Sequence, residues 1–220
     1  RNFFPDHLVT ESRNELLSIF KKHNINPILL SESDTKLGGV ETFHDAEKCA
    51  NLFKSNSNII EGILVILPNF GDEKGVADTI RLSGLNVPVL VQAYPDDLNK
   101  LEVKNRRDAY CGKISVCNNL YQYGIKYTLT NNHVIHPSAD SFQNELIDFV
   151  SVCRVVKGMK RVRIGAVGAR PNAFNTVRYS EKILERHGIS VTTIDLSEVI
   201  GKTKSLSEKD EVVIQALNKI

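Results

Sequence analysis

The sequence predicts an α/β protein with a doubly wound parallel sheet, followed by the beginning of a second α/β domain. Apolar runs of strand length alternate along the chain with segments of helical periodicity, an order typical of parallel sheets whose strands are joined by helices. The longest apolar run, residues 59–67, is nearly continuous and ends at Pro68. Such a run is typical of a strand that is covered on both faces, so we expect helices on both sides of the sheet.

The first predicted domain covers residues 1–157. Ser12 and Glu15 have capping-box spacing, which predicts a helix that begins at this point. Apolar stripes predict further helices around residues 46–53, 76–80 and 142–156, with another near Asp108. Strands are predicted at residues 26–30, 59–67, 87–93 and 127–130. Because the chain opens on a loop around Pro5, we expect this domain to lack its first strand.

A second, truncated domain is predicted over residues 158–220, where the chain breaks off inside an apparent helix. Residues 162–167 and 189–194 are its predicted strands. A helix over residues 172–187, opening on Asn172, is predicted to join them, and Gly188 stands where a helix C-terminal glycine belongs. The repeated strand–helix order makes the first domain Rossmann-like and the second the start of another α/β unit.

The composition excludes several classes of function. The 220 residues carry 28 basic and 26 acidic side chains, a formal net charge of +2, so nucleic acid is not an expected partner. The sequence contains no run of about 18 apolar residues, so it predicts no membrane-spanning helix. The four cysteines lack C-x-x-C spacing, so we expect reduced thiols in a cytoplasmic protein rather than disulfides or zinc ligands.

Two motifs allow more than one interpretation. His133 and His136 have a spacing that could chelate a metal on a helix, but Pro137 favours a loop. That loop could serve a substrate, an interface or only the local structure. Gly165-Ala-Val-Gly168 follows a predicted strand but lacks the third glycine of a dinucleotide-binding turn. A tight turn with glycines for packing is therefore favoured over a nucleotide site.

Polar and aromatic residues follow the longest apolar run. Ligands of open parallel sheets bind beyond the carboxyl ends of the strands. Phe70 is therefore a candidate to cover the apolar face of a ligand, and the alternative is that it packs back on the helix that follows it.

Five distinctive segments follow one another over about four-fifths of the chain: Arg1-Asn-Phe-Phe-Pro5, Leu67-Pro-Asn-Phe70, Gln92-Ala-Tyr-Pro-Asp-Asp97, Cys111-Gly-Lys-Ile-Ser-Val-Cys117 and residues 165–182. Together they resemble the N-terminal part of the L-fucose isomerase-like sugar isomerases, the family that also includes L-arabinose isomerase. The set is specific for the superfamily and not for one sugar.

The resemblance implies that the full-length protein is an intramolecular oxidoreductase, which interconverts aldoses and ketoses through an enediol. It also implies a divalent metal, commonly Mn²⁺, held by Glu, Asp and His residues beyond Ile220. This fragment alone is then expected to be inactive, with no catalytic or metal-binding residue. A homo-oligomer, trimer or hexamer, is implied, in which the first domain lends substrate contacts to the site of a neighbouring subunit.

The resemblance also assigns candidate substrate-binding residues. Arg1 corresponds by motif position to an arginine of the family's N-terminal loop, which implies contact with a sugar hydroxyl. Phe70 stands where L-fucose isomerase has an aromatic residue, although that residue is Trp. Asn69 and Gln92 are further candidates, because they lie at predicted strand ends.

Two other functions remain open at this point. The chain could be a non-enzymatic sugar-binding α/β module like the two-lobed periplasmic binding proteins, which would bind a sugar as a monomer without metal. It could also belong to a nucleotide-dependent enzyme, for which the glycine turn at Gly168 gives only weak support.

Overall fold

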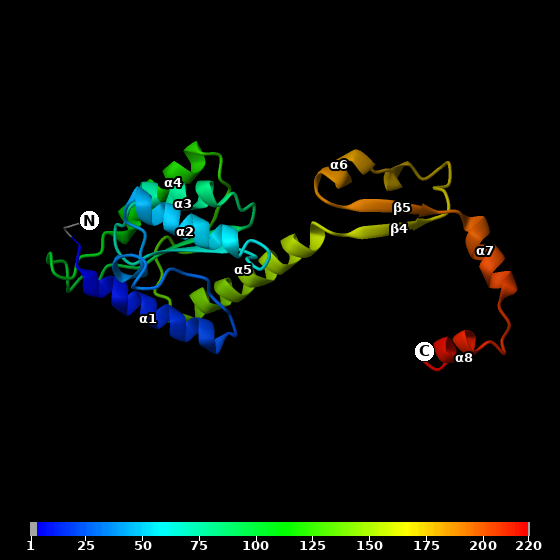
Figure 1. Ribbon diagram of the computed structural model, residues 1–220, viewed down its shortest axis with the longest axis horizontal. Helices are drawn as coiled ribbons and strands as arrows, with labels where there is room; N and C mark the ends of the chain where they lie inside the picture. Colours follow the sequence, from blue (N-terminus) through cyan, green and yellow to red (C-terminus); the bar gives the residue numbers. More distant parts are fainter. Residues whose placement is uncertain (1–3, 220) are drawn as a thin grey trace. The chain divides into compact units, whose positions relative to one another are not determined.

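The computed structural model describes residues 4–219 (Figure 1), so Arg1 lies outside the described residues. The chain divides into two compact units between Val156 and Lys157. The assignment of the second unit to the start of a further domain stays a prediction.

The first unit is built on a parallel sheet. Its strands are β1 (Ile63–Leu67), β2 (Val89–Ala93) and β3 (Thr128–Leu129), in the spatial order β1-β2-β3. The predicted α/β class and the parallel pairing are thus confirmed, with shorter strands than the apolar runs indicated. The doubly wound arrangement stays a prediction, because the three described strands follow one another in one direction.

Helices cover both faces of this sheet (Figure 1). They are α1 (Asp6–Lys22), α2 (Phe43–Ser55), α3 (Glu73–Ser83), α4 (Ala109–Gln122) and α5 (Asp140–Met159), with a short 3₁₀ turn, η1 (Lys36–Gly38). Alternate β1 side chains point to opposite faces. Val65 and Leu67 pack with α3 and α4, whereas Leu64 and Ile66 pack against the buried cluster of α1 and α5. The sheet is therefore the middle of three layers.

The start predicted for the first helix is wrong. Helix α1 begins at Asp6, directly after Pro5, and Ser12 lies inside it with its hydroxyl bonded to the Leu8 carbonyl at 2.6 Å. Leu8 extends the buried stripe by two turns before Leu16, so burial decides the helix length. The capping box of this unit opens α2 instead.

Residues 26–30 do not form the predicted strand. They are assigned neither helix nor strand and no sheet pairing involves them. Their apolar composition is that of a strand, but an extended segment becomes a strand only when a neighbour supplies backbone hydrogen bonds. Here the Leu30 carbonyl accepts a hydrogen bond from the Arg13 side chain at 2.6 Å.

The second unit contains a two-stranded parallel sheet. Strands β4 (Arg163–Val167) and β5 (Ser190–Ile194) pair in register, close to their predicted positions. The other elements are η2 (Asn175–Val177), α6 (Glu181–Arg186), α7 (Leu196–Ser205) and α8 (Glu211–Leu217). The helix predicted from Asn172 starts only at Glu181, since Arg170 holds residues 171–175 in a turn through their carbonyls.

Two glycines of the second unit adopt left-handed backbone conformations. Gly188 follows α6 with a φ of 81°, and a Cβ there would collide with the Lys160 backbone, so only glycine fits. Gly168, with a φ of 73°, donates its N–H to the Ile194 carbonyl at 2.9 Å and ties the end of β4 to β5. Gly168 thus forms a left-handed turn at the end of β4, and the packing role predicted for the two glycines of this turn stays a prediction. No helix within residues 4–219 is long and apolar enough to cross a membrane.

Candidate functional site

The candidate site lies at the carboxyl edge of the sheet in the first unit. The loop 68–71 follows β1, Tyr94 follows β2, and the loop 130–137 follows β3. Parallel strands place these three segments at one edge, where open α/β sheets bind their ligands.

Phe70 is partly exposed at this edge. Its ring stacks on Phe4, with centroids 6.0 Å apart and an interplanar angle of 7°. Below it, the Phe70 carbonyl lies so close to Gly112 that a Cβ on Gly112 would overlap it. The Cys111-Gly-Lys113 motif at the start of α4 therefore supports the loop that presents Phe70.

Asn69 shapes the same loop. It is 9% exposed, and its Oδ1 accepts the N–H of Gly71 at 3.1 Å. Gly71 has a φ of 74°, a conformation that glycine adopts without strain. In this structure Asn69 holds the turn that carries Phe70, and a direct contact between Asn69 and a substrate stays a prediction.

Gln92 is fully buried in β2, so it reaches no surface of the described residues. Its Nε2 donates to the Ile135 carbonyl at 2.6 Å, and the Ile135 N–H bonds to Ala93 O at 2.9 Å. Gln92 thus fixes the loop that carries His133 and His136. Its Oε1 has no hydrogen-bond partner among the described residues. Substrate binding by Gln92 stays a prediction.

A buried lysine holds the same loop from the other side. Lys113 is 3% exposed and donates to Thr130 Oγ1 and to the His133 carbonyl, both at 2.9 Å. Burial lowers the pKa of Lys113, and the neighbouring Cys117 and Glu145 oppose this shift. Two buried polar side chains, Gln92 and Lys113, therefore give the 130–137 loop one defined position.

Four residues that the sequence analysis did not group together meet at this edge. The Tyr94 hydroxyl donates to Glu15 Oε2 at 2.8 Å, and His136 Nδ1 lies 3.3 Å from Glu15 Oε1. The Arg107 guanidinium lies 4.7 Å from the centre of the Tyr94 ring and donates to the Pro68 carbonyl at 2.7 Å. Arg107 thus connects the Phe70 loop with the Glu15–Tyr94–His136 group.

The site offers hydrogen-bonding groups together with an aromatic face. The side chains of His136 and Glu15 are 47% and 27% exposed, so both can reach a ligand. Burial raises the pKa of Tyr94, with the Glu15 carboxylate adding to the rise, so its hydroxyl stays a proton donor. Sequence reasoning missed Tyr94 as a site residue, although the Gln92-Ala-Tyr94 segment marked its position.

The described residues do not fit a metal ion at this edge. No group of three or more His, Cys, Asp or Glu side chains with metal-binding geometry occurs within residues 4–219. His136 already lies against Glu15 and Ser138, and the His133 ring stacks against Tyr110. These contacts hold His133 and His136 in a structured loop.

Comparison with known proteins identifies the family. A family model described as the N-terminal domain of fucose/sulfoquinovose isomerase matches residues 1–160. A search of curated proteins found no match. The matched residues include the whole sheet of the first unit and each candidate residue at its carboxyl edge. The chain therefore belongs to the fucose/sulfoquinovose isomerase family, and its residues 1–160 are the N-terminal domain of that sugar isomerase family.

Proposed function

We propose that this chain is the N-terminal part of an aldose–ketose isomerase, and that the carboxyl edge of its first sheet contacts the sugar. The observation that supports this most is the continuous arrangement of Phe70, Arg107, Tyr94, Glu15 and His136 in a domain of this family. An open-chain sugar needs several hydrogen-bonding groups and one apolar wall.

Each group has a defined task. The partly exposed ring of Phe70, backed by Phe4, covers the apolar C–H face of the sugar. The Glu15 carboxylate accepts hydrogen bonds from sugar hydroxyls, and His136 donates or accepts according to its tautomer. Tyr94 and Arg107 hold these groups in place. The edge thus binds and orients the sugar.

The proton transfer itself is assigned to residues outside the described part. Moving a carbonyl from C1 to C2 needs a base near an acidified C–H bond, and a divalent cation such as Mn²⁺ supplies the charge that polarises both oxygens. Since residues 4–219 do not fit such a cation, we place its ligands beyond Ile220. We also propose a trimer or hexamer in which this edge completes the site of a neighbouring subunit.

A reducing cytoplasm is the compartment that we propose. All four cysteines are free, and Cys111 is exposed. An exposed thiol without a disulfide partner suits a compartment that keeps cysteines reduced.

Ketose formation by the natural-length protein tests the proposed reaction. Fucose, arabinose, sulfoquinovose and related aldoses are offered with Mn²⁺, and the assay is repeated after treatment with a chelator. Ketose that appears only with metal supports the isomerase. Tight metal-free binding of a sugar by a monomer, with no turnover of any aldose, would point instead to a sugar-binding module.

A further inference from the structure

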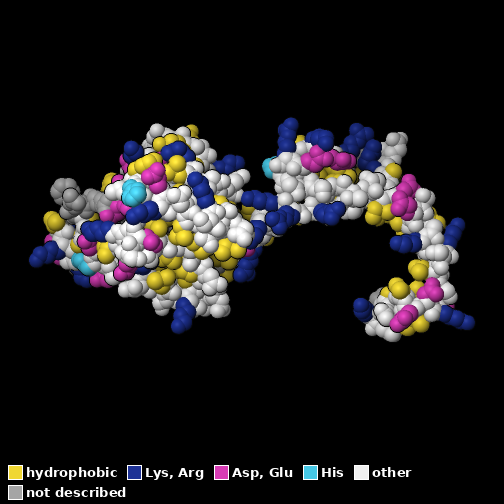
Figure 2. Space-filling model, viewed as in Figure 1, with side chains coloured by type: hydrophobic (Ala, Val, Ile, Leu, Met, Phe, Trp, Pro, Cys, Tyr) yellow, Lys and Arg dark blue, Asp and Glu magenta, His cyan; other side chains and the backbone are white. Residues whose placement is uncertain are grey.

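The surroundings of His136 distinguish it from an ordinary surface histidine. Figure 2 shows histidine side chains (cyan) on the surface of the first unit, so exposure alone means little. His44 illustrates the ordinary case, because its ring lies 3.7 Å from Glu47 of the same helix and both side chains are exposed. The carboxylate beside His136 comes instead from Glu15 of another element, α1, and lies at the edge of the sheet where ligands bind.

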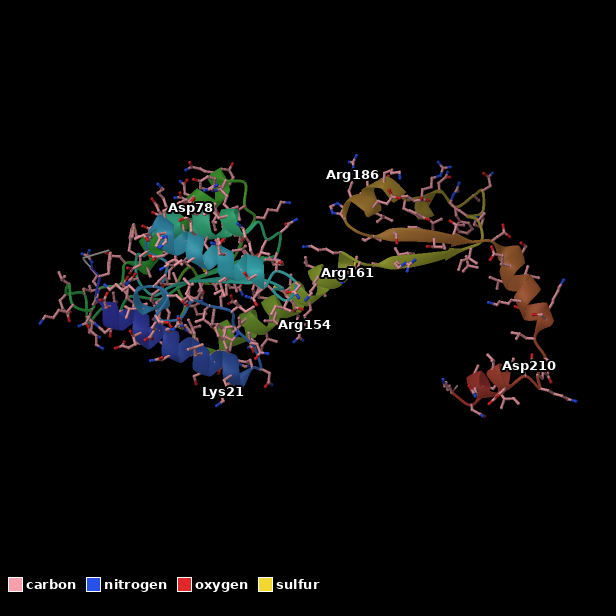
Figure 3. All side chains as sticks on the ribbon, in the orientation of Figure 1. Lys21, Asp78, Arg154, Arg161, Arg186 and Asp210 are labelled. Carbon is pink, nitrogen blue, oxygen red and sulfur yellow. The ribbon has the colours of Figure 1, made fainter. Side chains whose placement is uncertain are left out.

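Glu15 is held in place by an uncharged donor. Its Oε2 accepts the Tyr94 hydroxyl at 2.8 Å, and burial raises the pKa of Tyr94, so this proton stays on the hydroxyl. The largely buried carboxylate of Asp78, labelled in Figure 3, has a different partner, since the Arg81 guanidinium at 2.9 Å balances its charge. Glu15 is thus oriented by Tyr94, and its Oε1 faces His136 Nδ1 at 3.3 Å.

The contacts of His136 Nδ1 decide which ring nitrogen carries a lone pair. Nδ1 lies 2.8 Å from Ser138 Oγ and 3.3 Å from Glu15 Oε1, and the Ser138 backbone nitrogen is farther away at 3.4 Å. A hydroxyl can accept or donate, whereas a carboxylate only accepts. The carboxylate therefore favours the proton on Nδ1 and leaves the lone pair on Nε2. A half-exposed imidazole in this state is a base oriented by a carboxylate.

The aromatic face at the same edge fits a sugar in its cyclic form. Phe4 and Phe70 stack with an interplanar angle of 7°, so Phe70 is backed by a parallel ring and presents a flat surface. The C–H groups on one side of a sugar ring form a rigid apolar patch, whereas those of an open chain rotate. A rigid partner loses less conformational entropy on binding. Reducing sugars in water are almost entirely cyclic hemiacetals, so this is also the form that a protein meets.

Phe70 and His136 belong to one continuous arrangement. Arg107 donates to the Pro68 carbonyl at 2.7 Å, next to the Phe70 loop, and lies 4.7 Å from the centre of the Tyr94 ring. The Tyr94 ring in turn meets the His136 ring edge to face, with centroids 5.2 Å apart. The aromatic face and the base are therefore fixed parts of the same edge.

We propose that His136, oriented by Glu15, opens the ring of a cyclic aldose that lies on Phe70. His136 Nε2 removes the proton from the hydroxyl at C1, and the O–H electron pair becomes the second bond of the C1 carbonyl. The bond between C1 and the ring oxygen breaks, its electron pair stays on the ring oxygen, and the imidazolium returns the proton to that oxygen. One nitrogen serves both oxygens, because both are bonded to C1. The step consumes no oxidant, no reductant and no net proton.

Ring opening deepens the proposed function, because isomerisation needs the open-chain aldose and this edge supplies it. The step rests on that function only for the statement that the edge binds a sugar. Its proton moves between two oxygens, whereas the isomerisation moves a proton between C1 and C2. The two proton transfers can therefore be measured separately.

Interconversion of anomers tests ring opening, since the α- and β-anomers exchange through the open chain. The natural-length protein is given L-fucose, L-arabinose or sulfoquinovose, and also the 2-deoxy analogue of each, which opens its ring but cannot form a ketose. NMR follows the exchange at saturating sugar. We expect the protein to accelerate exchange over buffer, and His136→Gln and Glu15→Gln each to reduce this acceleration by about 100-fold.

His133→Gln is the matched control, because His133 lies in the same loop and its ring packs on Tyr110. This variant is expected to keep the full acceleration. Imidazole added to a His136→Ala protein is expected to restore exchange, a result that a merely structural role of the ring would not produce. Glu15→Gln keeps an oxygen for the Tyr94 hydroxyl, so it decides the matter if the His136 variants do not fold.

The outcomes separate ring opening from isomerisation. Ketose formation with anomer exchange at the buffer rate overturns ring opening and leaves the isomerase standing. Accelerated exchange without any ketose supports ring opening and overturns the proposed isomerisation. Acceleration that persists in His136→Gln, or no acceleration with any of these sugars, overturns the role of His136.

Discussion

The Tyr94 hydroxyl and the His136 ring contact the two oxygens of one carboxylate, that of Glu15. Tyr94 donates to Oε2 at 2.8 Å, and His136 Nδ1 lies 3.3 Å from Oε1. The rings of Tyr94 and His136 also meet edge to face, with centroids 5.2 Å apart. Helix α1, the end of β2 and the loop after β3 are thereby joined at one point of the sheet edge.

Removing the Tyr94 hydroxyl tests this connection. Tyr94→Phe leaves the Glu15 carboxylate without its buried donor, so we expect a loss of about 2 kcal/mol in the free energy of unfolding, measured with urea. Tyr123→Phe is the matched control, because Tyr123 is 49% exposed and is expected to change stability by less than about 0.5 kcal/mol. Equal effects of the two substitutions would show that the Glu15 bond contributes nothing.

Gly112 tests how the Phe70 loop is supported. A Cβ at position 112 overlaps the Phe70 carbonyl, so Gly112→Ala is expected to displace the loop and to cost about 1–3 kcal/mol of stability. Gly158→Ala is the control, since nothing lies within 4 Å of its Cβ position in α5. That variant is expected to gain up to about 1 kcal/mol from helix propensity. A thermal melt compares the two, and a fully stable Gly112→Ala variant would contradict this packing.

Cysteine reactivity tests the burial of the first unit. Burial raises the pKa of Cys49 and of Cys153 from the ordinary 9.0 to about 11. At pH 8 we expect iodoacetamide to label the exposed Cys111 while these two thiols stay unmodified, as read by mass spectrometry. Fast labelling of Cys49 at pH 8 would contradict the burial.

The same two thiols give a pH dependence of stability. Between pH 9 and pH 11 the unfolded chain loses the thiol protons that the folded chain keeps, so the folded state binds more protons. Stability contributed by these groups is therefore expected to fall as the pH rises through this range. A Cys49→Ala variant should show a weaker fall than the parent in urea unfolding at pH 9 and pH 11.

Local patterns in the sequence predicted the elements whose neighbours complete them. The strands after residue 59 were confirmed, since each has a neighbouring strand that pairs with it. The helices around residues 46–53 and 142–156 were confirmed as well, and each packs apolar side chains in the interior of the first unit. Residues 26–30 have the same apolar character without a paired neighbour, and they form no strand. The helix expected at Asn172 failed because Arg170 binds the carbonyls of a turn, which no periodicity reveals.

The candidate site could be predicted only in part. The position of Asn69 and Phe70 at the sheet edge could be predicted because both follow a strand end directly in the sequence, and their contact with a sugar stays a prediction. The Glu15–Tyr94 bond joins residues 79 positions apart, and His136 adds a third segment, so only the fold brings them together. Gln92 was a candidate for sugar binding because it lies near a strand end. In the structure its side chain is buried and donates a hydrogen bond to the Ile135 carbonyl.

The Michaelis constant of the Phe70→Ala variant tests the central claim most directly. In the natural-length isomerase, with the aldose that it converts, loss of the aromatic wall is expected to raise KM by about 10-fold, which corresponds to about 1.4 kcal/mol of lost binding. Phe43→Ala is the control, because Phe43 is exposed at the start of α2 and lines no part of the site. A higher KM for Phe70→Ala alone is the predicted result. Unchanged KM and kcat in the Phe70→Ala enzyme would remove this sheet edge from the sugar site.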